Sequence, residues 1–260
     1  QVNTRKTSTD AFYERLSQEG IEAERHPWMP DCLYLWQTGR LDGISAFREG
    51  LFYVQDTASR LAVIASGVEP GMEVLDCCAA PGGKSFAAAI QMRNEGHITA
   101  CDIGAKKLPR ITQGAERLGL DILSVLQGDA KNPREEFLGR FDLVLADVPC
   151  SGFGVIRKKP EIRYKTREEI AALPAVQLEI LRAASRCVKA GGTLLYSTCT
   201  VLAEENQMVV EAFLEKNPNF EPQTFKLPRP LERPTNGMLT LYPYVYDCDG
   251  FFLCRLHKVR

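Results

Sequence analysis

The sequence has few features that mark a specialised class of protein. None of its apolar runs is long enough to span a bilayer, and no charged-then-apolar leader opens the chain. Its residues are 45% hydrophobic and 25% charged, without low-complexity tracts, which excludes a disordered or fibrous chain. We therefore expect a globular, monomeric, cytoplasmic protein without a membrane partner.

The nine cysteines lack the paired spacing of a disulfide framework or a zinc site. Cys77 and Cys78 are adjacent, and Cys248 and Cys254 lie too far apart for a C-x-x-C motif. Free thiols in this number indicate a reducing compartment. The sequence thus predicts no metal site, and most of the cysteines are interpreted as small core residues.

The chain also lacks a basic excess, because its formal net charge is −1. Overall charge therefore gives no nucleic-acid signature. Two loose basic groups are typical of solvated surface: Lys226, Arg229 and Arg233, and then Arg255, His257, Lys258 and Arg260. A tighter group directly follows a loop of candidate catalytic residues, and its members are Arg157, Lys158, Lys159, Arg163, Lys165 and Arg167.

Two domains are predicted, residues 1–50 and residues 51–260. The first is interpreted as a small α+β unit, with a possible strand at 2–4, a helix at 11–18 and a strand at 33–36. The chain begins at Gln1 without a methionine, so we expect a further segment upstream.

From Gly71 onward, short apolar runs alternate with helical patterns, which is typical of a doubly wound α/β fold. Strands are predicted at 72–76, 97–101, 122–126, 141–146 and 193–196, with helices at 84–92, 106–118, 167–188 and 204–216. Phe220 and residues 251–253 are assigned to two closing strands without a helix between them. The prediction is a mostly parallel sheet with an antiparallel edge.

A glycine turn, residues 78–84, follows the first strand of the predicted sheet. In a doubly wound sheet, ligands bind beyond the carboxyl ends of the strands. The spacing matches neither a P-loop nor the G-x-G-x-x-G dinucleotide motif, so a nucleoside without a pyrophosphate is favoured. Asp102 and Asp129 follow the next two strands, where they suit ribose hydroxyls and an adenine amino group. Either carboxylate alone would more simply cap a turn, but two beside a glycine turn favour a nucleoside pocket.

Cys150 and Cys199 follow the fourth and fifth strands, which are neighbours in the usual strand order. Both thiols should therefore reach the same crevice, although two buried structural cysteines are the simpler alternative. Beside a methyl donor, a thiolate that adds to C6 of cytosine makes C5 nucleophilic, and a base must then remove the C5 proton. Because a free thiol has a pKa near ~8.5, the nucleophile needs nearby positive charge, for which Lys84 is a candidate.

Three motifs, in this order and spacing, resemble the RNA cytosine-5 methyltransferases of the Sun/Fmu (RsmB-type) family. They are Asp76-x-Cys78-Ala-Ala-Pro-Gly-Gly-Lys84, Asp147-x-Pro-Cys150-Ser-Gly152 and Ser197-Thr-Cys199-Thr200. The resemblance covers essentially the whole chain. It implies a Rossmann-like class I fold that binds S-adenosyl-L-methionine through Cys78, Ala79, Ala80, Pro81, Gly82, Gly83, Lys84, Asp102, Asp129 and Asp147.

The resemblance also implies residue roles. Cys199 would be the nucleophile and Cys150 would assist product release, with Asp147 and Lys84 completing the catalytic group; strand geometry alone leaves the two thiol roles interchangeable. The implied substrate is RNA, with 16S ribosomal RNA favoured, and the implied RNA contacts are Arg157, Lys158, Lys159 and Arg163. A transfer-RNA cytosine-5 methyltransferase and an idle ribosome-assembly RNA-binding protein are the alternatives. The family's N-terminal helical RNA-binding domain is absent from this sequence.

Overall fold

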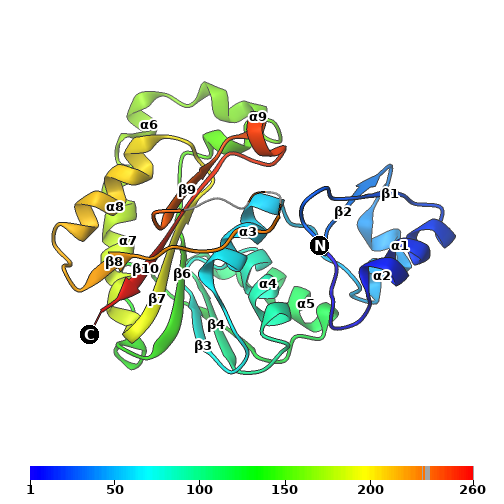
Figure 1. The fold of residues 1–260 in the computed structure, drawn as a ribbon, viewed down its shortest axis with the longest axis horizontal. Coiled ribbons are helices and arrows are strands. Elements are labelled where there is room, and N and C mark those ends of the chain that lie inside the picture. The colour runs from blue at the N-terminus through cyan, green and yellow to red at the C-terminus, as the bar shows by residue number, and fades with distance from the viewer. Residues whose placement is uncertain (230, 232–234, 260) are drawn as a thin grey trace.

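The computed structural model describes residues 1–229, 231 and 235–259. Arg233 and Arg260, which belong to the two loose basic groups, lie outside these residues. A small N-terminal domain packs beside a larger domain built around one twisted sheet (Figure 1). Within the described part of the chain, we find no helix with the length and apolar character needed to cross a membrane.

The small domain pairs two short strands and two helices around a core of its own. Its elements are α1 (Thr9–Gln18), β1 (Glu22–Arg25), β2 (Leu33–Trp36) and α2 (Ser45–Arg48). The Ser8 hydroxyl caps α1 by accepting a hydrogen bond from the Ala11 amide at 3.2 Å. Strands β1 and β2 are antiparallel. The strand predicted at 2–4 is instead a single bridge between Val2 and Phe52, so that prediction was wrong in extent.

The large domain contains an eight-stranded sheet in the order β5-β4-β3-β6-β7-β10-β8, with β9 paired to β10. Its strands are β3 (Glu73–Asp76), β4 (His97–Asp102), β5 (Leu123–Gln127), β6 (Phe141–Asp147), β7 (Val188–Thr198), β8 (Phe220–Pro222), β9 (Met238–Leu241) and β10 (Phe251–Lys258). The five strands β3 to β7 are parallel, and β10 is antiparallel to each of its neighbours. The predicted parallel order and antiparallel edge are confirmed.

Helices cover both faces of this sheet (Figure 1). One face carries α3 (Thr57–Ser66), α4 (Gly83–Gln91) and α5 (Leu108–Leu118), and the other carries α7 (Leu173–Cys187) and α8 (Gln207–Leu214). Alternate side chains of β6 enter the two cores, since Leu143 and Leu145 pack toward α4 whereas Val144 packs toward α7. Both faces of the strand are therefore apolar, and its polar functional residues lie at the strand end.

The structure differs from the prediction in three parts of the chain. The single helix expected at 167–188 is two helices, α6 (Arg167–Ala171) and α7, because Pro174 lies in the first turn of α7 rather than at a kink. The helix expected at 106–118 begins as a 3-10 turn, Ala105–Lys107, before α5. The prediction that no helix lies between the two closing strands was wrong, because the short helix α9 (Pro243–Tyr246) lies there together with the unpredicted strand β9.

Candidate active site

A cavity of about 400 Å³ opens at the carboxyl ends of the parallel strands. It is lined by residues that follow β3, β4, β5, β6 and β7, together with two side chains of α7. The lining residues are Cys77, Cys78, Ala80, Asp102, Ile103, Lys107, Asp129, Ala130, Lys131, Asp147, Val148, Pro149, Cys150, Val176, Ile180 and Cys199. The three predicted aspartates and both predicted cysteines therefore share one cavity.

The glycine turn after β3 forms one wall of this cavity. Of the described residues in the turn, Cys78 and Ala80 line the cavity, whereas Ala79, Pro81, Gly82, Gly83 and Lys84 are not among its lining residues. Gly82 has a φ of +110°, and a Cβ there would overlap the Phe86 ring, so only glycine fits. The turn is therefore a tight strand-to-helix connection that exposes two of its residues to a ligand.

Asp76 lies behind this wall as a buried carboxylate. Its Oδ2 accepts a hydrogen bond from the Ser85 hydroxyl at 2.7 Å. Its Oδ1 has no hydrogen-bond partner among the residues that the structure describes. Burial raises the pKa of Asp76 to about 6, because desolvation disfavours the charged form. The sequence placed Asp76 in the motif but gave it no role.

Asp102 is held at the cavity edge by backbone donors. Its carboxylate accepts the Ala80 amide at 3.1 Å and the Gly104 amide at 2.8 Å. Asp129 is fixed in a similar way, by the Lys131 amide at 3.0 Å and the Asn132 side chain at 2.7 Å. The Ile103 side chain, 67% exposed, lines the same cavity and offers an apolar surface to a base. Carboxylates beside an apolar wall fit a nucleoside.

Asp147 joins the cavity to a buried lysine. Lys84 Nζ lies 2.7 Å from Asp147 Oδ2, and the Ser197 hydroxyl donates to Asp147 Oδ1 at 2.7 Å. Lys84 also donates to the Ser59 hydroxyl at 3.3 Å, and its Nζ lies 5.2 Å from the centroid of the Phe251 ring. The sequence placed Ser197 within a motif without a contact and gave Ser59 no role. Their positions fix the ammonium and carboxylate beside the thiols.

The Sγ atoms of Cys150 and Cys199 lie 3.2 Å apart and share a hydrogen bond. That hydrogen bond lowers the pKa of Cys199, which the Lys84 ammonium also favours, against the opposing effects of burial and Asp147. The pKa of Cys150 is raised, first by its hydrogen bond to Cys199 and then by burial. Either sulfur can donate this hydrogen bond, and the opposite directions of the two shifts mean that the close pair carries one thiolate more easily than two.

A buried polar network supports both cysteine loops. Glu205 Oε2 accepts the Ser151 amide at 2.8 Å and the Gln177 side chain at 2.8 Å. Gln177 also donates to the Pro149 carbonyl at 3.0 Å, and the Ser151 hydroxyl donates to the Thr200 hydroxyl at 3.0 Å. The sequence analysis missed Glu205 and Gln177. Their only signal was a polar residue within a predicted helix, which is usually solvated.

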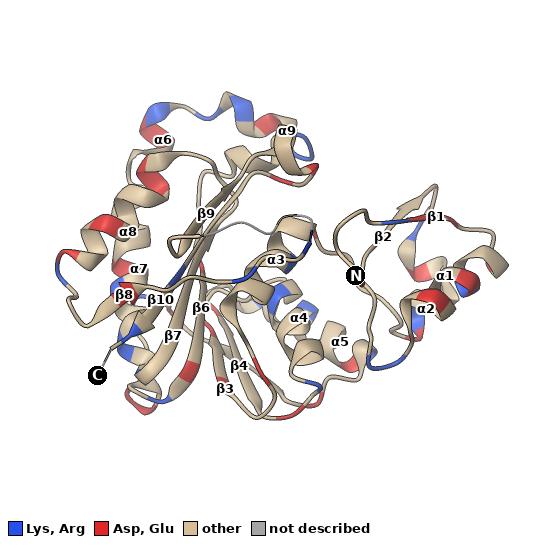
Figure 2. Cartoon of the chain, viewed as in Figure 1, with Lys and Arg blue, Asp and Glu red and all other residues tan. Residues whose placement is uncertain are grey.

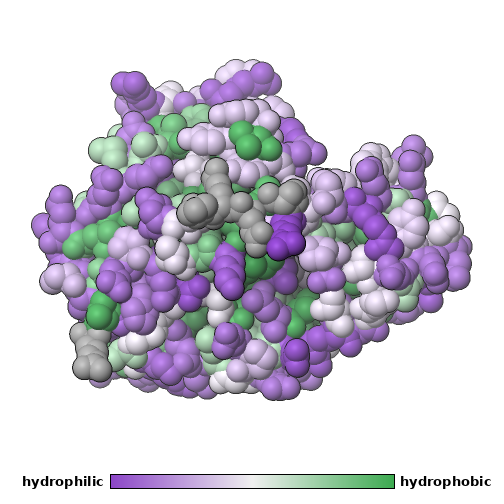
Figure 3. Space-filling model, viewed as in Figure 1, coloured by the Kyte–Doolittle hydropathy of each residue, from purple (hydrophilic) through white to green (hydrophobic). Residues whose placement is uncertain are grey.

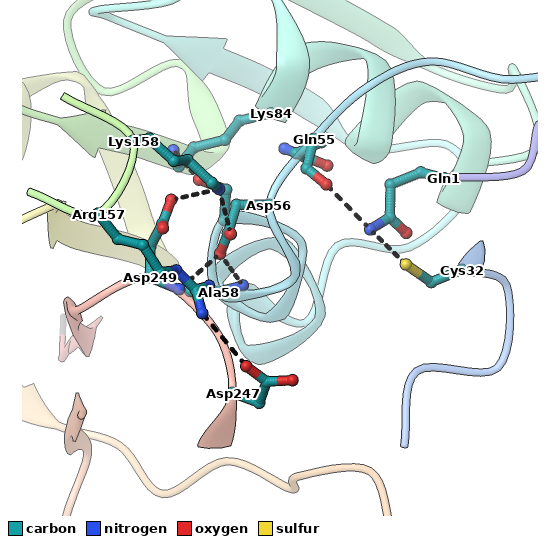
Figure 4. Close-up of polar contacts among 11 residues, drawn as sticks. Gln1, Cys32, Gln55, Asp56, Ala58, Lys84, Arg157, Lys158, Asp247 and Asp249 are labelled. Carbon is teal, nitrogen blue, oxygen red and sulfur yellow. Dashed lines mark hydrogen bonds and ion pairs between the residues drawn. The ribbon is translucent and has the colours of Figure 1, made fainter. Parts of the chain in front are cut away.

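The predicted RNA-binding residues lie in the segment between η4 (Phe153–Val155) and α6, at the top of Figure 2. Arg157 pairs with Asp247 at 3.3 Å, and Arg163 donates to the Pro160 carbonyl at 3.1 Å. Lys158 bonds two carboxylates, Asp56 and Asp249, as Figure 4 shows. Hydrophilic residues dominate this upper edge in the space-filling view (Figure 3). Arg157, Lys158 and Arg163 thus make contacts within the protein.

Comparisons with known proteins agree along the whole chain. A family model described as 16S rRNA methyltransferase RsmB/F matches residues 64–257, and one described as the ferredoxin-like domain of RsmF/B-like methyltransferases matches residues 1–42. The probable ribosomal RNA small subunit methyltransferase B of Bacillus subtilis is 40% identical over 266 residues, covering 99% of this chain and 59% of the relative.

Two further proteins extend the comparison. The ribosomal RNA small subunit methyltransferase B of Klebsiella pneumoniae is 36% identical over 263 residues, covering 100% of this chain and 59% of the relative. The solved structure of a methyltransferase homolog protein from Pyrococcus horikoshii has 30% identity and a TM-score of 0.83, covering 99% of this chain and 85% of that one. The chain spans 59% of the length of each curated relative.

Proposed function

Because the chain belongs to the 16S rRNA methyltransferase RsmB/F family, we propose that it methylates C5 of a cytosine in small-subunit ribosomal RNA. The observation that carries the proposal is the pair of thiols, Cys150 and Cys199, 3.2 Å apart at the wall of a nucleoside-sized cavity. An idle RNA-binding protein would have no need of two juxtaposed thiols with pKa values shifted in opposite directions.

The cofactor of this reaction is S-adenosyl-L-methionine, which supplies an electrophilic methyl group when bound. The carboxylate of Asp102, fixed by two backbone amides, would accept hydrogen bonds from the ribose hydroxyls. Asp129 would accept one from the adenine amino group, and the exposed Ile103 side chain would supply an apolar surface for the ring. The residues of the cavity thus fit a nucleoside with a sulfonium arm.

In the reaction, the Cys199 thiolate adds to C6 of the cytosine, so that a Sγ–C6 bond forms and electron density moves to C5. Lys84 favours the thiolate and is itself held by Asp147. Once C5 carries the methyl group, its proton leaves to a base and the Sγ–C6 bond breaks, returning the electron pair to Cys199. Cys150, at hydrogen-bond distance from Cys199, assists this second stage.

Arg157, Lys159 and Arg163 are proposed to contact RNA phosphates beside the cavity, and Lys158 belongs to the same predicted cluster. The division into residues 1–50, an RNA-binding type of domain, and residues 51–260, the catalytic domain, is retained as part of the proposal. A monomeric state and a cytoplasmic location stay predictions.

The test uses the purified chain, S-adenosylmethionine with a radiolabelled methyl group, and either 16S ribosomal RNA or transfer RNA. The RNA is digested to nucleosides, which are separated against a 5-methylcytidine standard. Label in 5-methylcytidine from ribosomal RNA supports the proposal. Label only from transfer RNA would favour the tRNA alternative, and label in another nucleoside would overturn cytosine-5 chemistry.

A further inference from the structure

Lys158 bridges two carboxylates that come from distant parts of the chain. Its Nζ lies 2.6 Å from Asp56 Oδ2 and 2.7 Å from Asp249 Oδ2 (Figure 4). The side chains of Asp56 and Asp249 are 16% and 7% exposed. Burial and the neighbouring Asp56 raise the pKa of Asp249, so a cation between the two carboxylates stabilises their charged forms. Lys158 is that cation.

The two carboxylates are themselves built into the fold. Asp56 caps α3 by accepting the Ala58 amide at 2.9 Å, and the same oxygen accepts the Asp249 amide at 3.2 Å. Burial lowers the pKa of Lys158, but its hydrogen bonds to the two carboxylates outweigh this effect, so the pKa of Lys158 is raised. The ammonium therefore keeps its charge, and three segments meet at it: the loop after β6, the start of α3 and the start of β10.

Each of these segments also contacts the catalytic group. The Gly250 amide donates to the Gly154 carbonyl at 2.8 Å, and the Gly154 amide donates to the Cys199 carbonyl at 3.0 Å. Helix α3 carries Ser59, the hydroxyl partner of Lys84, while β10 begins with Phe251, whose ring lies beneath the Lys84 ammonium. A shift of the loop relative to α3 and β10 would therefore change the distances between Cys150, Cys199 and Lys84.

We propose that Lys158 is a positioning residue, which clasps residues 150–158 against α3 and β10 and so holds Cys150 in hydrogen-bond contact with Cys199. Two largely buried carboxylates share the Lys158 ammonium, whereas the single carboxylate partner of Arg157, Asp247, is exposed. Arg157, Lys159 and Arg163 are therefore the proposed phosphate contacts of the cluster. The effect on turnover rests on the proposed function. The effect on the thiols does not, since it requires neither RNA nor methyl transfer.

The experiment measures alkylation of Cys199 by iodoacetamide as a function of pH, without RNA, with peptide mass spectrometry to distinguish Cys199 from the other cysteines. The charged and titratable groups that act on Cys199 are Cys150, Asp147 and Lys84, and all three remain in every variant. The variants are Lys158→Met, which keeps the length and removes the charge, Lys158→Arg as rescue, and Lys216→Met, at an exposed lysine that follows α8, as the control.

We expect Lys158→Met to raise the alkylation midpoint by roughly one pH unit, a tenfold loss of thiolate at a given pH. Lys158→Arg should restore the midpoint and Lys216→Met should leave it unchanged. In methylation assays, kcat of Lys158→Met should fall about 10- to 100-fold, the scale of a small misplacement of reacting groups, with KM for RNA and its salt dependence unchanged. Circular dichroism checks that the variant folds.

Asp249→Asn separates positioning from direct electrostatics and serves if Lys158→Met fails to fold. Removal of a negative charge would by itself lower the Cys199 midpoint, whereas loosening of the clasp raises it. A raised midpoint in Asp249→Asn supports the proposal, and a lowered one overturns it.

The Lys158→Met variant has an outcome that overturns the proposal as well. If it folds, shows an unshifted alkylation midpoint and gives a shallower salt dependence of RNA binding, Lys158 is instead a phosphate ligand. If the wild-type chain transfers no methyl group to RNA, the proposed function is refuted. The alkylation measurement still tests the positioning role of Lys158, because it uses no RNA.

Discussion

Gly154 and Gly250 pack backbone against backbone, 96 positions apart in the sequence numbering. A Cβ on Gly154 would overlap the Gly250 carbonyl oxygen and stand 2.8 Å from the Cys199 carbonyl oxygen. No side chain fits between the loop that carries Cys150 and the segment before β10 without moving one of them. The close contact of the two thiols thus depends on two residues that have no side chain.

Gly154→Ala should therefore destabilise the protein by about 1–3 kcal/mol, the cost of overpacking a close contact. Urea unfolding measures this change. Gly43→Ala is the matched control, because a Cβ at Gly43 meets nothing within 4 Å. Equal midpoints for the two variants would show that the loop and strand can separate without cost.

The two cysteine variants should fail in different ways. Cys199→Ala lacks the nucleophile, so neither product nor adduct forms. Cys150→Ala can still add to C6 and methylate, but product release should stall, leaving RNA attached through Cys199. Denaturing gel electrophoresis should then show a slow protein band that ribonuclease removes. An adduct with Cys199→Ala would reverse the roles, and full turnover by both variants would exclude the covalent mechanism.

Asp102→Ala should weaken binding of S-adenosylmethionine by about 1–3 kcal/mol, the scale of a lost charge-assisted hydrogen bond. Isothermal titration calorimetry measures the affinity. Asp102 also accepts two backbone amides, so Asp102→Asn should be measured beside it as a less disruptive change. Asp42→Ala, in the small domain, is the control. Wild-type affinity in a folded Asp102 variant would remove this carboxylate from the cofactor site.

Replacement of Arg157, Lys159 and Arg163 by glutamine should make the salt dependence of RNA binding shallower. Each lost phosphate contact should change the log–log slope by about 0.7 for single-stranded RNA. Arg93→Gln is the control, since Arg93 lies between α4 and β4, before the amino end of β4, whereas the cavity opens at the carboxyl ends of the strands. Filter-binding titrations at several salt concentrations give the slopes. An unchanged slope would assign the cluster to solvated surface.

Asp76 should make stability fall as the pH rises from about 4 to about 6. Burial raises the pKa of Asp76 to about 6 in the folded chain, so in this window the folded state binds more protons than the unfolded state. The loss is about 3 kcal/mol at most, and Asp76→Asn should remove it. Urea unfolding of both proteins across this range measures the difference. Parallel curves would mean that Asp76 titrates normally.

The sequence predicted those parts of the site that follow from local pattern. Apolar runs placed β3 to β7, and the residues after each run gave Asp102, Asp129, Asp147, Cys150 and Cys199, which the structure gathers in one cavity. The class I methyltransferase fold and the resemblance to the RsmB-type family are both confirmed. A short continuous apolar run bounded by turn residues is typical of a strand buried on both faces, so these elements could be predicted without coordinates.

Other features depend on pairings that no local pattern records. Lys158 and Asp249 are 91 residues apart, and each alone is typical of a solvated loop. Glu205 is 2% exposed although it lies in an acidic stretch, because Gln177 and the Ser151 amide satisfy it. Strand β9 lies in a proline- and glycine-rich segment, and it forms because it pairs with β10. Tertiary packing overrides intrinsic propensity in each case.

The position of β10 in the sheet determines when the sheet can be completed during synthesis. Strand β10 is made after every other strand described here, yet it lies between β7 and β8 and also pairs with β9. A growing chain on the ribosome can form β3 to β7 early, but the residues that brace Cys199, Gly250 among them, arrive only at the end. The hydrogen bond from Gly250 to Gly154, beside Cys199, therefore forms only after residue 250 has been synthesised.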